Sequence, residues 1–98
     1  CEAMDHACFA MDATLAPFVD RWRRAGYEVI VTADHGQDAR GHHGGTGPDQ
    51  RDFAFYYFGP AEGPAPEVVL DQLALAPTML GRLGVPVPAT MKAAPFLR

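Results

Sequence analysis

The stretch that decides the fold is Glu28-Val29-Ile30-Val31-Thr32-Ala33-Asp34-His35-Gly36. Its first part is an apolar, β-branched run, which predicts a short buried strand over Tyr27–Thr32 that ends at an Asp-His-Gly turn. The pattern around it is a helix, then a glycine, then a strand that is continuously apolar rather than alternating. This order is typical of an α/β protein with a mostly parallel sheet. Ligands in such folds gather at the carboxyl ends of the strands, where Asp34 and His35 lie.

The segment before this strand has the spacing of an amphipathic helix. Its apolar residues recur at intervals of three and four and predict a face packed in the core. Pro17 lies inside the pattern and predicts a kink or a new helix start, because proline lacks the N–H donor. Gly26 predicts the end of the helix, with arginines in the last turn. The residues of the apolar face are Met4, Cys8, Met11, Leu15, Phe18 and Trp22.

The segments after the turn alternate between loops and short elements. The loop from Gly36 to Gln50 contains five glycines and one proline, with Asp38, Arg40 and Asp49 as expected surface charges. A strand over Phe53–Phe58 is expected to be too aromatic to have a solvated face. Residues 60–66 are expected to form a surface loop and residues 67–70 a short strand. A helix with Pro77 in its first turn is expected to carry Met79, Leu80 and Leu83 inward and to end at Gly84. Residues 88–98 are expected to form a loosely held tail.

Asp34 and His35 stand at the end of the strand, and His42 and His43 follow after six intervening residues. Carboxylate oxygen and neutral imidazole are good zinc ligands, and glycines let the backbone turn tightly around an ion. The neighbours Asp34 and His35 can serve one ion only because the strand has ended, since neighbours within a strand point to opposite faces. His42 is open to three interpretations, as a second ligand, a substrate-facing group or a solvated loop residue, of which the last is favoured.

Composition sets the outer limits. Ninety-eight residues with 48% apolar content fit one globular domain at most. The net charge of −4 comes from scattered acids, so the sequence has no nucleic-acid-binding patch, and no apolar run is long enough to span a bilayer. The chain begins at Cys1, within a helical pattern and without Met, which predicts that an N-terminal portion is missing. The compartment cannot be inferred from this sequence.

Several motifs together resemble the C-terminal part of the alkaline phosphatase superfamily, and most closely its type I phosphodiesterase/nucleotide pyrophosphatase branch. They are Thr32-Ala33-Asp34-His35-Gly36, His42-His43-Gly44-Gly45, Leu73-Ala74-Leu75-Ala76-Pro77-Thr78 and Leu83-Gly84-Val85-Pro86. The resemblance implies that residues 1–98 are the C-terminal portion of one metallohydrolase domain, an α/β sandwich. It further implies two divalent metal ions, zinc or alternatively manganese, with a small phosphate ester as substrate. By this analogy Asp34 and His35 bind the metal that activates a Ser or Thr nucleophile, and His43 binds the second metal.

The same resemblance places the nucleophile upstream of this chain. Neither Thr32 nor Thr46 is assigned that role, and Asp5-His6 lacks the Asp-x-x-x-His spacing of the remaining ligands. The chain alone is therefore expected to be inert and to need completion by a missing N-terminal segment. Sulfatase, phosphonate hydrolase and phosphoglycerate mutase chemistry are alternatives within the superfamily. Outside enzymes, the alternative is a small metal-binding or interaction module.

Overall fold

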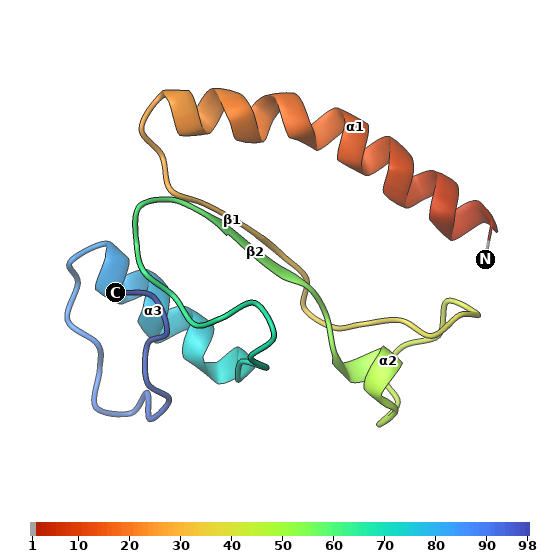
Figure 1. Cartoon of the computed structure of the whole chain (residues 1–98). Helices are drawn as coiled ribbons and strands as arrows, with labels where there is room; N and C mark the ends of the chain where they lie inside the picture. Colours follow the sequence, from red (N-terminus) through yellow and green to blue (C-terminus); the bar gives the residue numbers. More distant parts are fainter. Residues whose placement is uncertain (1) are drawn as a thin grey trace. The chain divides into compact units, whose positions relative to one another are not determined.

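The computed structural model describes residues 2–98, and Cys1 lies outside the described residues. Contacts within the chain divide it into two compact units, one ending at Gly59 and the other running from Pro60 to Arg98. Figure 1 shows the elements of each unit in chain order.

The first unit opens with helix α1, Glu2–Arg24. The helix is continuous through Pro17, so the expected new start at that residue is wrong. Gly26 ends the helix as predicted. It adopts a φ of +90°, and the Tyr27 N–H reaches back to the Trp22 carbonyl at 3.0 Å. This is the hydrogen-bond pattern of a glycine-terminated helix, in which a residue without Cβ adopts the left-handed conformation.

Two short strands follow, β1 (Val29–Thr32) and β2 (Phe55–Phe58), joined through the one-turn helix α2 (Pro48–Arg51). They pair antiparallel, with Val29 opposite Phe58 and Thr32 opposite Phe55. Figure 1 shows β2 returning alongside β1. The expectation of an α/β sandwich with a mostly parallel sheet is therefore wrong for the described residues. Parallel strands need a long crossover, usually helical, and the segment between β1 and β2 reverses the chain instead.

Burial in the first unit also differs from the expectation. None of the described residues of α1 is buried, and Met11, Phe18 and Trp22 of the predicted apolar face are 63%, 45% and 41% exposed. The apolar stripe exists as a helix pattern but does not form a packed core. The aromatic strand likewise has a solvated position, because Tyr56 is 57% exposed. Among the residues of this unit that the structure describes, Val29 is the buried apolar side chain.

The second unit holds a 3-10 turn, η1 (Gln72–Ala74), that leads directly into helix α3 (Leu75–Arg82). The Asp71 carboxylate caps the turn by accepting the Leu73 N–H at 2.9 Å. The helix starts two residues before Pro77, which is buried together with Thr78. The prediction that Met79, Leu80 and Leu83 face inward is wrong in part, because Met79 and Leu83 are exposed. Residues 67–70 do not form a strand.

The C-terminal tail is held, contrary to expectation. Arg98 and Glu62 exchange two backbone hydrogen bonds, at 2.9 and 2.8 Å. The Phe96 N–H donates to the Thr78 hydroxyl at 3.0 Å, and Leu97 is buried. These contacts fasten the end of the chain to α3 and to the start of its own unit. Gly84 ends α3 as predicted, with a φ of +69°.

Candidate metal site

The candidate ligands Asp34 and His35 follow directly after β1. Asp34 Oδ1 lies 3.5 Å from His35 Nε2. His35 Nδ1 lies 2.8 Å from the Gly36 carbonyl oxygen. Because a carbonyl oxygen only accepts, Nδ1 carries the proton of this hydrogen bond, which leaves Nε2 as the ring nitrogen that could bind a metal ion. A carboxylate oxygen and a ring nitrogen thus face each other, with the second ring nitrogen held by the backbone.

His43 is brought back to this point by the glycine-rich loop. Its ring stacks on that of His35, with centroids 4.5 Å apart and an interplanar angle of 10°. The structure therefore brings together all three residues that the sequence proposed as ligands, Asp34 beside His35 and His43 on His35. The cluster is open to solvent, since the Asp34 side chain is 85% exposed and that of His35 is 39% exposed.

Backbone hydrogen bonds join the two ends of the loop from Gly36 to Gln50 and form a turn inside it. The Gly36 N–H donates to the Gln50 carbonyl at 3.1 Å, which ties the end of β1 to α2. Asp38 and His42 are joined by the Asp38 N–H, which donates to the His42 carbonyl at 3.0 Å. The Gly41 N–H donates to the Asp38 carbonyl, and Gly41 itself has a φ of +84°, which favours a residue without Cβ.

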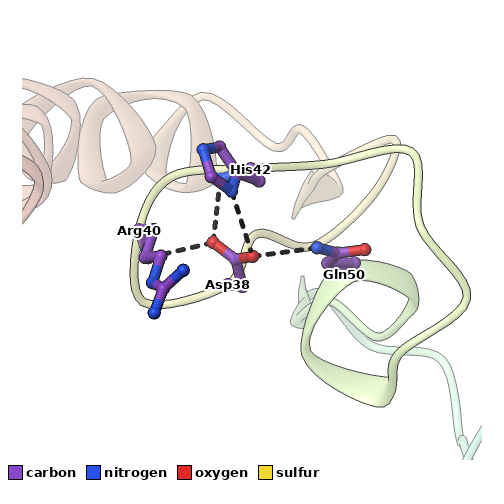
Figure 2. Close-up of polar contacts among 4 residues, drawn as sticks. All are labelled: Asp38, Arg40, His42 and Gln50. Carbon is purple, nitrogen blue, oxygen red and sulfur yellow. Dashed lines mark hydrogen bonds and ion pairs between the residues drawn. The ribbon is translucent and has the colours of Figure 1, made fainter.

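Asp38 is the centre of this loop (Figure 2). Its Oδ1 accepts the backbone N–H groups of Arg40 and His42, both at 2.9 Å, and its Oδ2 accepts the Gln50 amide at 2.9 Å. The His42 Nδ1 atom lies 3.6 Å from Oδ2. The pKa of Asp38 is lowered, mainly by the hydrogen bond from the His42 N–H and further by those from Gln50 and Arg40 and by the charge of His42. Burial of the carboxylate acts in the opposite direction.

Sequence reasoning missed Asp38, which it treated as a surface charge. Its side chain is only 21% exposed. A local signal was present, because Asp at the first and Gly at the fourth position favour a type I turn, and Asp38 and Gly41 have that spacing. The side chain of His42 is 70% exposed, in line with the solvated interpretation. Thr32, which was not assigned as the nucleophile, uses its hydroxyl in a hydrogen bond to the Ala54 carbonyl at 3.0 Å.

The donor set fits a divalent ion in part. Two tetrahedral zinc ligands at about 2.0–2.1 Å lie about 3.3 Å apart, close to the 3.5 Å between Asp34 Oδ1 and His35 Nε2. The lone pairs of stacked, parallel rings do not converge on one point, so His35 and His43 do not chelate one ion as they stand. Accordingly, residues 2–98 contain no group of three or more His, Cys, Asp or Glu side chains arranged to hold one metal.

Comparison with known proteins adds no relative. No protein-family model, no curated protein and no solved structure matches this chain. Within the described part of the chain, no helix has both the length and the apolar content that crossing a bilayer requires.

Proposed function

We propose that this chain supplies part of the metal site of a metal-dependent phosphoric ester hydrolase of the phosphodiesterase/nucleotide pyrophosphatase type. In this proposal Asp34 and His35 hold one divalent ion and His43 holds a second. The observation that carries it is that His35, just after β1, lies against both other residues: its Nε2 atom is 3.5 Å from Asp34 Oδ1, and its ring stacks on that of His43.

The stacked rings support the division of ligands between two ions. Parallel imidazoles can direct their in-plane lone pairs to neighbouring positions, and the centroid distance of 4.5 Å is comparable to the ~3.5–4 Å between the metals of two-metal hydrolases. The backbone bond at His35 Nδ1 supports ligation through Nε2, because metal-binding histidines usually donate their other N–H to an oxygen. Gly44 and Gly45, which follow His43, carry no side chain that would obstruct a small substrate.

Divalent ions would supply charge neutralisation at a phosphoryl group and activation of a weak nucleophile near neutral pH. The residues of this chain would orient those ions, His35 through its backbone hydrogen bond and His43 through its stack on His35. Three ligands are fewer than two such ions require, so the remaining ligands and the nucleophile come from outside these residues. The 98-residue chain by itself therefore should not turn over a phosphodiester.

Zinc titration by calorimetry tests the ligand assignment. The full chain should bind zinc weakly, and Asp34→Ala and His43→Ala should each lower the affinity by at least about tenfold. His42→Ala is the matched control, since it removes the neighbouring imidazole and should leave the affinity within about twofold. Equal affinities for the wild type, Asp34→Ala and His43→Ala would contradict the proposal.

Inorganic phosphate distinguishes a phosphoester site from a metal-binding module. Ions held by so few protein ligands retain open positions, so phosphate should bind the zinc-loaded chain and broaden its ³¹P resonance. The His43→Ala variant should reduce that broadening. Zinc binding without any phosphate binding would favour the module, and turnover of a phosphodiester by the chain alone would overturn the assignment of the nucleophile to another segment.

A further inference from the structure

We infer that Asp38 is a positioning residue, whose carboxylate holds the segment leading to His43 so that the His43 ring stacks on His35. Its consequence for metal binding rests on the proposed function, but the positioning itself does not. Figure 2 shows the contacts of the Asp38 carboxylate with Arg40, His42 and Gln50.

The Asp38 carboxylate accepts hydrogen bonds from the backbone immediately before His43. Oδ1 accepts the N–H groups of both Arg40 and His42, and the Asp38 N–H in turn donates to the His42 carbonyl. His42 is thus bonded through its N–H and its carbonyl to the same residue. Because His42 directly precedes His43, these two hydrogen bonds fix the direction of the backbone at His43.

The same carboxylate is fastened to the base of the loop. Oδ2 accepts the Gln50 side-chain amide, and the Gln50 backbone carbonyl accepts the Gly36 N–H. Gly36 directly follows His35. Asp38 and Gln50 therefore connect the chain beside His43 to the chain beside His35, and the stacked rings lie at the two ends of this connection.

The loop needs such a connection because its sequence gives little stiffness. Gly41 and Gly44 precede and follow the two histidines, both with positive φ, and glycine loses more conformational freedom on ordering than other residues. Asp38 itself is a poor metal ligand in this arrangement. Its oxygens accept three N–H donors at 2.9 Å, which use three of the about four lone-pair sites of a carboxylate and leave little capacity for a cation.

The test uses ¹H NMR of the histidine Hε1 resonances in the full chain without metal. Stacked rings shift each other's resonances, and His43→Ala defines the unstacked position of the His35 signal. Asp38→Ala should move the His35 signal most of the way to that position. Asp38→Asn keeps one oxygen that accepts both backbone N–H groups but replaces the oxygen that accepts the Gln50 amide, so the His35 signal should lie between its wild-type and Asp38→Ala positions. Asp49→Ala removes an exposed acid of α2, next to Gln50, and is the control that should leave the His35 and His43 signals unchanged.

An Asp38→Ala spectrum in which the His35 and His43 signals stay at their wild-type positions overturns the inference. If that variant also loses the cross-strand contacts of β1 and β2, Gln50→Ala decides instead. It removes one donor and leaves the carboxylate in place, so the same signals should move in the same direction. Unchanged signals in Gln50→Ala would then overturn the inference.

Zinc affinity separates this inference from the proposed function. Asp38→Ala should lower the zinc affinity of the wild type by about tenfold and should have no further effect in the His43→Ala background. A lost stack with unchanged zinc affinity would support positioning by Asp38 and contradict ligation by His43. A lost stack in a chain that binds no zinc would support the positioning and overturn the metal proposal.

Discussion

Gly36 shows how a single residue shapes the candidate site. A Cβ at this position would overlap with the backbone carbonyl oxygens of Asp49 and Asp52, so the close approach of β1 and the α2 turn requires glycine. The hydrogen bond from its N–H to Gln50 depends on that approach. The glycine of the Asp-His-Gly turn therefore has a packing role in addition to leaving space near the ligands.

The ionisation of Asp38 makes the stability of its loop depend on pH. Its pKa is lowered in the folded chain, so its ionised form contributes stability above the unfolded-state pKa of about 3.9, and this contribution is lost as the pH falls through the lower, folded-state pKa. The backbone amides of Arg40 and His42 should therefore report a transition below about pH 3.9. Amide ¹H–¹⁵N shifts recorded against pH measure it.

Asp38→Asn provides the control for that titration. The two amides should then show no acid transition of their own, because the asparagine side chain does not ionise in this range. A wild-type transition at or above about pH 3.9 would contradict the lowered pKa.

At the scale of one element, α3 and its end contain two glycines with opposite roles. Gly81 lies in the helix, and a Cβ added there would meet no neighbouring side chain or loop within 4 Å, whereas Gly84 follows the helix with a φ of +69°. Gly81→Ala should stabilise the chain by about 0.5–1 kcal/mol through helix propensity. Gly84→Ala should destabilise it by about 1–2 kcal/mol, because an L-residue is strained in the left-handed conformation.

Urea denaturation of the two variants, followed by circular dichroism, measures these changes in unfolding free energy. The pair is internally controlled, since both substitutions add the same methyl group to the same helix region. An unchanged or raised unfolding free energy in Gly84→Ala would show that the end of α3 does not depend on the glycine conformation, and a lowered one in Gly81→Ala would contradict the helix-propensity argument.

At the scale of the molecule, the end of the chain is held by a side chain from the middle of its unit. Thr78 is fully buried and accepts the Phe96 N–H. Thr78→Val keeps the shape but leaves that N–H without its acceptor, which should cost about 1–3 kcal/mol in unfolding free energy. Hydrogen exchange at the Phe96 amide should accelerate accordingly.

Thr78→Ser separates the hydroxyl from the methyl group in that experiment. Serine keeps the acceptor, so the Phe96 amide should remain protected even though a buried methyl group is lost. Faster exchange in the serine variant than in the valine variant would contradict a hydrogen bond as the fastening contact.

Local features of this chain were predictable because their causes are local. Gly26 and Gly84 end their helices as expected, since helix termination depends on the φ of one residue. The ring of His43 stacks on that of His35, while the binding of metal by these residues stays a prediction. The contacts of Asp38 with Arg40 and His42 belong to a local turn whose signal was overlooked, whereas its contact with Gln50, twelve residues away, has no local signal.

What the sequence by itself determined is therefore the existence of α1, of two apolar strands and of a glycine-rich turn that carries the histidines. Only the tertiary structure decided that the strands run antiparallel and that the apolar face of α1 stays largely exposed, with Met4 and Leu15 half-buried. The physical reason is that an apolar run specifies burial in general but neither its partner nor its direction, which depend on contacts distant in sequence. The carboxylate of Asp38 acquired its role in the same way, from the fold around it.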